Sequence, residues 1–198
     1  MLGLIDYSSA CEIQQREKLR VLEKESPGCV FFLEHHPVIT LGRHCGAGDI
    51  LYPETFLDKQ GYSVARSSRG GNVTVHEPGQ LVVYYVLPVK SKDSAAFVSG
   101  IAGPVISALN SHFGTNLSFP AENPGIWQDG KKCASIGFDL RQGVSMHGMA
   151  VNVCNSLLGF SFVNPCGMSS SVMTTLSALA ERNVTVEETA SLLASIYV

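Results

Sequence analysis

The sequence predicts a mixed α/β domain, an α+β arrangement in which helices pack against a mixed or antiparallel sheet. Several short runs rich in β-branched and aromatic residues have the length of strands, and two longer segments carry apolar residues at helical spacing. No repeat, low-complexity tract or linker interrupts the 198 residues. Because a chain of this length can bury one sizeable core, we expect a single domain over residues 1–198.

The first half of the chain is predicted to supply most of the strands. A short strand over 2–6 leads into a charged surface helix over 8–24, which ends at Ser26-Pro27-Gly28. The further strands expected in this half cover 29–33, 38–41, 62–66 and 81–87. Residues 67–79 hold too many glycine and polar residues to form a strand throughout.

The second half is predicted to contain two helices and a hairpin. Apolar residues at 97, 101, 105 and 108 predict a helix over 94–113, with Gly114 as its cap and Pro104 as the site of a kink. Asp129-Gly130 lies between strand-like segments 126–128 and 133–140, which predicts a β-hairpin. Thr185 and Glu188 form a capping box for the last helix.

The composition excludes several classes of protein. Hydrophobic residues make up 45% and charged residues 16%, which is typical of a compact globular chain. The net charge of −3 and the scattered lysines and arginines argue against nucleic-acid binding. The most apolar run, 81–89, has the length of a strand, and the N-terminus lacks the basic region of a signal peptide. We therefore expect a cytoplasmic protein with no membrane span and six free thiols.

Residues 69–80, RGGNVTVHEPGQ, form the first candidate binding segment. Adjacent glycines let the backbone approach a ligand closely and present N–H groups to it. A plain surface turn would also explain the glycines. However, Arg69, Thr74, His76 and Gln80 stand where a turn needs only small residues, so a ligand-binding loop is the favoured interpretation.

A lysine and a cysteine form two further candidates. Lys132 stands at the turn end of the predicted hairpin and can reach a pocket, although taken alone it is better explained as a solvated charge. Cys166, between a proline and a glycine, is expected in a rigid exposed turn, where it is either a nucleophile or merely a small residue. A thiol with an unperturbed pKa of about 8.5 needs a neighbour to act as a nucleophile. Lys132 or His147 could be that neighbour.

The histidines near residue 40 do not predict a metal site. Adjacent His35 and His36 on a strand point to opposite faces, and with His44 and Cys45 they match no zinc spacing. We expect them to be solvated or satisfied in the core.

Together these patches resemble the lipoyl(octanoyl) transferase family. The resemblance runs from about residue 34 to 167, and the matching segments are 34–43, 69–80 with Tyr84, 125–127, 132–137, 147–152 and 165–167. It implies the fold of biotin and lipoate protein ligase catalytic domains and a catalytic Cys/Lys pair, which falls on Cys166 and Lys132. It implies no cofactor and no ATP.

The resemblance also assigns residues to an acyl pocket. By carry-over, its lining consists of Arg69, Gly70, Gly71, Asn72, Val73, Thr74, Val75, His76, Ser135, Ile136, Gly137, Gly148, Met149 and Ala150. Val75 and Glu77 depart from the family, which usually has a larger residue and a glycine there. We expect Glu77 to point to solvent at the pocket mouth.

The activity that the resemblance implies is octanoyl transfer by way of a thioester on Cys166. The donor is octanoyl-acyl carrier protein, and the acceptor is a lipoyl-domain lysine of a 2-oxoacid dehydrogenase complex or of the glycine cleavage H protein. Lys132 would depress the thiol pKa and carry protons, while backbone N–H groups around 135–137 would hold the oxyanion.

Three other interpretations remain open. An ATP-dependent lipoate–protein ligase on the same fold would use the lysine without needing a cysteine. A Cys–His hydrolase built on Cys166 and His147 would release free acid. A non-catalytic carrier-binding or lipid-binding module would leave Cys166 inert.

Overall fold

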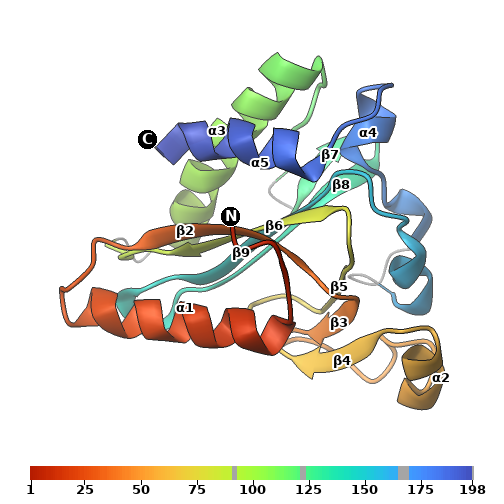
Figure 1. Cartoon of the computed structure of the whole chain (residues 1–198), viewed down its shortest axis with the longest axis horizontal. Helices are drawn as coiled ribbons and strands as arrows, with labels where there is room; N and C mark the ends of the chain where they lie inside the picture. The colour runs from red at the N-terminus through yellow and green to blue at the C-terminus, as the bar shows by residue number, and fades with distance from the viewer. Residues whose placement is uncertain (91–92, 121–123, 165–169, 198) are drawn as a thin grey trace.

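The computed structural model describes residues 1–90, 93–120, 124–164 and 170–197 and contains two sheets (Figure 1). The six-stranded sheet has the order β1-β2-β6-β9-β8-β7, and the three-stranded sheet has the order β4-β3-β5. Their strands are β1 (Leu4–Ile5), β2 (Cys29–His35), β3 (Val38–Leu41), β4 (Ser63–Arg66), β5 (Val73–His76), β6 (Gln80–Val86), β7 (Ile126–Gln128), β8 (Lys131–Asp139) and β9 (Met146–Asn152). β1 with β2 and β3 with β4 are parallel pairs, and the other pairs are antiparallel. The mixed α/β class is thus confirmed.

In the described part of the chain the helices are fewer than the strands, and most of them are short. They are α1 (Tyr7–Leu22), α2 (Glu54–Lys59), α3 (Ser94–Phe113), α4 (Leu176–Leu179) and α5 (Val186–Ala194), with 3-10 turns η1 (Arg141–Gly143), η2 (Leu158–Phe162), η4 (Ser170–Val172) and η5 (Ser195–Tyr197). The sequence did not predict α2, α4 or the strands β5 and β9, and β5 lies inside the segment 69–80 that was expected to be a loop.

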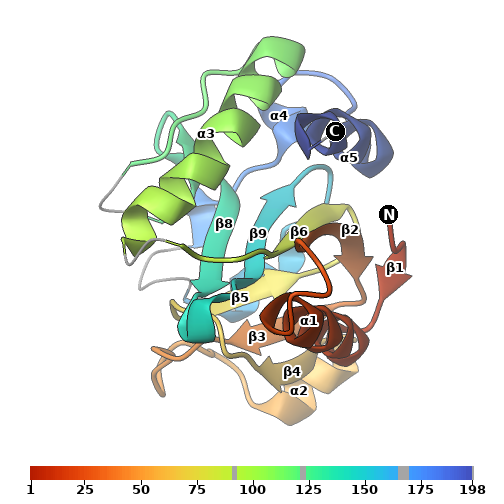
Figure 2. The same ribbon diagram turned by 90° about the vertical axis from the view of Figure 1, so that its left-hand side faces the viewer.

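β6 lies inside the large sheet and is buried on both faces. Leu81, Val83 and Tyr85 pack into a core shared with α3 and α5, whereas Val82 and Tyr84 pack on the side of α1. Figure 2 shows α1 on one side of the sheet and α3 with α5 on the other. Because successive side chains of a strand point to opposite faces, a continuous apolar run is what a doubly covered strand requires.

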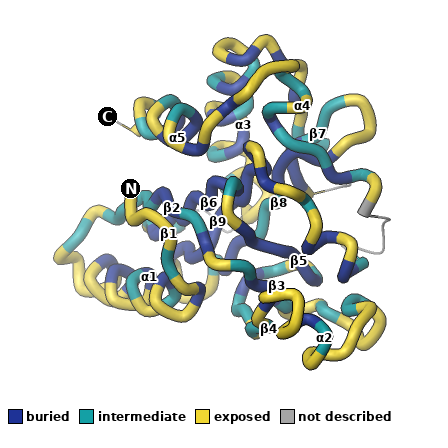
Figure 3. Tube along the Cα trace, turned by 45° about the vertical axis from the view of Figure 1, so that its right-hand side comes forward, coloured by how far each residue is buried: buried dark blue, intermediate teal, exposed yellow. Residues whose placement is uncertain are grey.

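The small sheet encloses a second core. Ile39 and Val75 pack there against Leu57 of α2 and Phe160 of η2. In Figure 3 the strands β5, β6 and β9 form the buried centre of the molecule, while α1 and α2 expose their outer faces. The junction of the two cores lies between β5 and the large sheet.

α3 has the bounds that its periodicity predicts. The Asp93 carboxylate accepts the Ala96 N–H at 3.0 Å at its start, and Gly114 ends it with a left-handed φ of 68°. By length and composition alone, α3 could cross a membrane. A single helix of this kind is weak evidence for a membrane span, because the core helices of soluble proteins pass the same test. Its Val105 and Leu109 are completely buried in the main core, whereas most of the helix is exposed or half-buried.

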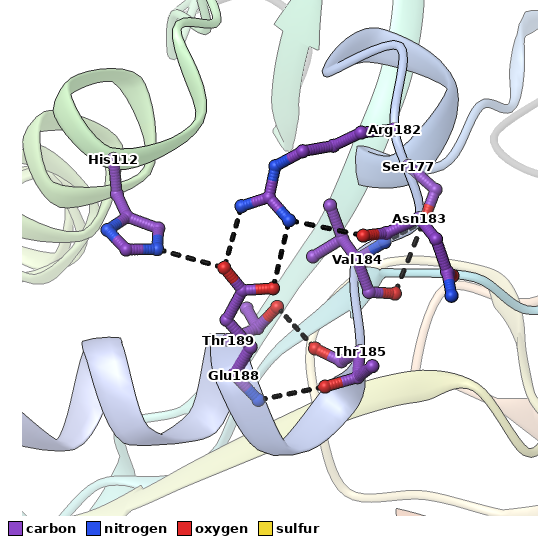
Figure 4. Close-up of polar contacts among 8 residues, drawn as sticks. All are labelled: His112, Ser177, Arg182, Asn183, Val184, Thr185, Glu188 and Thr189. Carbon is purple, nitrogen blue, oxygen red and sulfur yellow. Dashed lines mark hydrogen bonds and ion pairs between the residues drawn. The ribbon is translucent and has the colours of Figure 1, made fainter.

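α5 begins at the predicted residue, but only half of the predicted capping box forms. The Thr185 Oγ1 accepts the Glu188 N–H at 3.1 Å. The Glu188 carboxylate turns away, to Arg182 at 2.6 Å and His112 at 3.0 Å (Figure 4). The side chain therefore joins the start of α5 to the end of α3 instead of closing the box.

Candidate active site

A cavity lies where β5 of the small sheet meets β8 and β9 of the large one. It is lined by Tyr7, Arg69, Gly71, Asn72, Val73, Thr74, His76, Tyr84, Pro124, Lys132, Ser135, Ile136, Gly137, His147, Gly148, Met149 and Ala150. Three segments that are far apart in the sequence, 69–76, 132–137 and 147–150, thus share one site. Ligand sites are commonly concave, mostly apolar and furnished with a few polar groups, as this one is.

Two residues predicted to line the pocket lie outside the cavity. Val75 is completely buried and points into the second core, because it occupies the face of β5 opposite to Thr74 and His76. Gly70 donates its N–H to the Phe138 carbonyl at 2.9 Å and so joins the loop to β8. Cys166, the predicted nucleophile, lies outside the described residues.

Four lining residues were not predicted as such. Tyr84 and His147 belong to the segments that carry the resemblance, which was the signal available for them. Tyr7 and Pro124 stand in segments that carry no functional signal in the sequence. Tyr7 reaches the cavity from α1 and donates its hydroxyl proton to Ser67 Oγ at 2.7 Å.

Lys132 is buried in the cavity wall rather than solvated. Its residue is 4% exposed, and its Nζ lies 5.5 Å from the centroid of the Trp127 ring. The Thr174 N–H donates to its carbonyl at 3.0 Å, which fixes the backbone at this position. The solvated-charge interpretation applies instead to Lys131, which is exposed and donates to the Ser171 carbonyl at 2.8 Å.

Two neutral histidines face the cavity. Burial lowers the pKa of His147 to about 4, with the Arg69 guanidinium as a further cause. Burial, together with neighbouring His35, also lowers the pKa of His76 well below its ordinary value. His76 Nδ1 is 2.8 Å from Gln80 Oε1, and Gln80 Nε2 donates to the Val75 carbonyl at 3.0 Å. The amide oxygen therefore faces His76, so Nδ1 carries the proton and Nε2 does not.

Arg69 lines the cavity and also stabilises the Gly-rich segment that begins at this residue. Its Nη2 donates to the Thr40 carbonyl at 2.7 Å and to Thr40 Oγ1 at 2.9 Å, and its Nη1 donates to the Gly70 carbonyl at 3.1 Å. The guanidinium thus joins β3 to the Gly-rich segment, and its side chain packs beside Gly137. The loop is therefore built on a buried cation.

The edge of β8 presents backbone groups to the cavity. In an antiparallel strand, the N–H and carbonyl groups of alternate residues point to the same side. The Phe138 carbonyl accepts the Gly70 N–H, and the Ala134 carbonyl lies beside Gly125, so both point away from β9. Ile136 lies between them and has the same direction. Its N–H therefore also points away from β9, and Ile136 is one of the residues that line the cavity.

The expectation that Glu77 points to solvent is wrong. Glu77 is 3% exposed, and its carboxylate accepts hydrogen bonds from the Leu157 N–H at 2.7 Å and Asn155 Nδ2 at 3.0 Å. The Tyr62 hydroxyl also donates to it. Donors from two distant segments surround the side chain and hold it inside the protein, which the Pro-Gly sequence after it did not indicate.

The histidines near residue 40 have structural surroundings. His35 is completely buried, with Nδ1 2.9 Å from the Ile5 carbonyl and Nε2 2.8 Å from Tyr84 Oη. His36, its neighbour, is exposed. Within the described part of the chain, no three His, Cys, Asp or Glu side chains are grouped so that they could hold a metal ion.

The fold is that of a known class of proteins. It is shared with lipoate-protein ligase A bound with ATP, at a TM-score of 0.76 and 16% identity over 98% of this chain and 81% of that one. A bipartite lipoate protein ligase of Thermoplasma acidophilum aligns with a TM-score of 0.74 and 16% identity, over 98% of this chain and 80% of that one. These likenesses show that the chain has the fold of lipoate protein ligases.

The chain belongs to the lipoyl protein ligase A/B catalytic domain family, whose model matches residues 6–197. A protein of Nitratidesulfovibrio vulgaris named Octanoyltransferase is 37% identical over 177 residues, which cover 88% of this chain and 80% of that protein. The resemblance stated from the sequence is thus confirmed.

Proposed function

We propose that this protein transfers an octanoyl group from octanoyl-acyl carrier protein to a lysine of a lipoyl domain. The acceptor would be the lipoyl domain of a 2-oxoacid dehydrogenase complex or the glycine cleavage H protein, in the cytoplasm. The name and 37% identity of the N. vulgaris relative support octanoyl transfer. The observation that carries the proposal is the buried Lys132 in a cavity that glycines and apolar residues line together with polar side chains.

Cys166 is the proposed acyl carrier and Lys132 its proton partner. An ammonium group near a thiol favours the thiolate, which is the nucleophilic form. The thiolate attacks the donor thioester, a tetrahedral oxyanion forms, and its collapse expels the carrier's thiol, which takes a proton from Lys132. The acceptor amine then attacks the enzyme thioester and gives up a proton to Lys132, and Cys166 leaves as the thiolate.

The cavity wall supplies the groups that this reaction requires. The Ile136 N–H on the free edge of β8 is the proposed donor to the oxyanion. Gly137, Gly148 and Ala150 lie on the cavity face of the sheet and leave apolar space for the alkyl chain. Because the donor is already a thioester, the transfer needs no ATP and no cofactor.

The same fold occurs in a ligase bound with ATP, so the decisive experiment compares two acyl sources. The purified protein is incubated with an unmodified lipoyl domain and either octanoyl-acyl carrier protein alone or free octanoate with ATP and Mg²⁺. We expect octanoylation of the lipoyl domain only from the carrier-bound acyl group. Modification from octanoate and ATP alone would establish a ligase instead. Release of free octanoate without a modified acceptor would establish a hydrolase.

A further inference from the structure

Glu77 is a buried carboxylate beside the cavity for which the proposed chemistry has no use. Its carboxylate accepts hydrogen bonds from Tyr62, Asn155, Ser156, Leu157 and Gly159. Removing a carboxylate from water costs several kcal/mol unless other groups replace the water. No ion pair reaches Glu77 in the described part of the chain, so hydrogen-bond donors alone stabilise it.

The carboxylate first fixes the segment 155–159. Leu157 has a φ of 62°, a conformation that costs a bulky residue roughly 1–2 kcal/mol. The 2.7 Å hydrogen bond from its N–H to Glu77 holds it there. A methyl group on Gly159 would lie 2.5 Å from both Tyr62 and Val75, so the segment is pressed against the back of β5.

Asn155 connects the Glu77 carboxylate to β9 by hydrogen bonds. Its Nδ2 donates to Glu77 at 3.0 Å and also approaches Asn152 Oδ1 at 3.3 Å. Asn152, which is 1% exposed, accepts from Gln80 Nε2 at 2.9 Å and donates to the Thr174 carbonyl at 3.2 Å. Asn152 is therefore the point where the hydrogen bonds from Glu77 branch.

Each branch ends at a residue that lines the cavity. Through Gln80, the first branch reaches His76, whose Nδ1 is 2.8 Å from the amide oxygen. Through Thr174, the second reaches Lys132, whose carbonyl accepts the Thr174 N–H at 3.0 Å. One buried carboxylate is thus connected to both residues, to His76 through side-chain hydrogen bonds and to the Lys132 carbonyl through the backbone of Thr174.

We propose that Glu77 is a positioning residue that aligns His76 and Lys132 in the cavity wall through Asn155 and Asn152. Its kinetic consequence rests on the proposed transfer reaction, whereas the alignment itself does not. A displacement of about 1 Å in a reacting group can cost about a hundredfold in rate. Loss of Glu77 should therefore act on the chemical step more than on substrate binding.

The test compares Glu77→Ala and Glu77→Gln with Thr189→Ala, a buried hydrogen-bonding residue of α5 that does not line the cavity. For octanoyl transfer we expect Glu77→Ala to lower kcat about tenfold to a hundredfold per folded molecule, with KM for the carrier changed less than about threefold. Glu77→Gln keeps an acceptor for Leu157 and Asn155 and should recover most of the rate. Thr189→Ala should lose stability without losing kcat.

An NMR measurement tests the alignment without using activity. The imidazole ¹⁵N resonances of His76 should show one Nδ1–H tautomer in the wild type and should shift or broaden in Glu77→Ala. Asn155→Ala removes the hydrogen-bonded link between Glu77 and Asn152 but leaves the other donors to Glu77 in place. It therefore serves as the second variant if Glu77→Ala does not fold, and it should alter the same His76 resonances. Unchanged His76 resonances in the folded variants, or equal kcat in Glu77→Ala and Thr189→Ala, would overturn the proposal. If Glu77→Ala alters the His76 resonances but the wild type transfers no octanoyl group, the proposed function is refuted and the positioning role is supported.

Discussion

Gly125 lies directly against the side chain of Lys132. A methyl group at Gly125 would lie 2.5 Å from Lys132 Cε and 2.7 Å from the Ala134 carbonyl oxygen, and the φ of Gly125 is 150°. Contacts this short are incompatible with a side chain unless the neighbours move. The glycine therefore makes room for the buried lysine, and the start of β7 and the position of the ammonium are coupled.

Gly125→Ala should displace Lys132 and lower octanoyl transfer by at least about tenfold. The matched control is Gly100→Ala in α3, where a methyl group meets nothing within 4 Å and should stabilise the helix by about 1 kcal/mol. Steady-state kinetics and thermal unfolding of both variants check this. Unchanged kcat in Gly125→Ala would show that the lysine does not need this position.

Acid should destabilise the fold through its buried histidines. Burial lowers the pKa of His35 and of His147 to about 4, whereas the pKa of a histidine in the unfolded chain is about 6.5. Between these values the unfolded chain binds more protons, so the free energy of unfolding should fall as pH drops from about 6.5 to about 4. Each histidine contributes up to about 1.4 kcal/mol per pH unit.

Urea denaturation at a series of pH values measures this slope. His35→Gln should make the slope shallower, whereas His36→Gln, at an exposed position on the next residue, should leave it unchanged. A wild-type free energy of unfolding that stays constant between pH 7 and pH 5 would contradict the account.

Arg69→Ala should destabilise the protein as well as weaken its activity. Removing the guanidinium leaves the Thr40 carbonyl without its 2.7 Å donor, at a cost of about 1–3 kcal/mol. Arg69→Lys should recover only part of this, because an ammonium cannot reproduce the fork of contacts. Urea denaturation, with exposed Arg16→Ala as the control, measures both. Lost activity at unchanged stability would make Arg69 a ligand contact only.

Thr185→Ala should lower the free energy of unfolding by about 1 kcal/mol, because its Oγ1 caps α5. Arg182→Ala, which removes the exposed partner of Glu188, should have a smaller effect. Thermal unfolding compares the two variants. A larger loss in Arg182→Ala would mean that the cluster of Figure 4, rather than the cap, holds this helix.

The parts of the fold that depend on local sequence could be predicted. α3 has its expected bounds because its apolar spacing, its start and its Gly114 cap all lie within the segment. The hairpin forms at Asp129-Gly130, which adopt φ values of 50° and 73°. β9 was missed because a strand with a glycine at 148 shows no β pattern. That glycine is required since a methyl group there would lie 2.2 Å from the Val83 carbonyl oxygen.

The parts of the site that depend on distant segments could not be predicted from local sequence. Lys132 looks solvated in a hairpin, and its burial comes from contacts with Trp127 and from pairing with Met173 and Thr174. Glu77 precedes a Pro-Gly turn that suggests the surface, and its donors other than Tyr62 come from about eighty residues further along the chain. The family resemblance located the cavity segments because it reports on the assembled site.

The most direct test of the central claim is intact-protein and peptide mass spectrometry after incubation with octanoyl-acyl carrier protein. We expect one octanoyl group on Cys166, lost when a lipoyl domain is added and absent in Cys166→Ala. Lys132→Ala should leave the thiol in place but slow its acylation and its alkylation by iodoacetamide at neutral pH, with recovery as pH approaches about 8.5. Transfer by Cys166→Ala at the wild-type rate, or identical pH profiles of alkylation in Lys132→Ala and wild type, would contradict the Cys166/Lys132 mechanism.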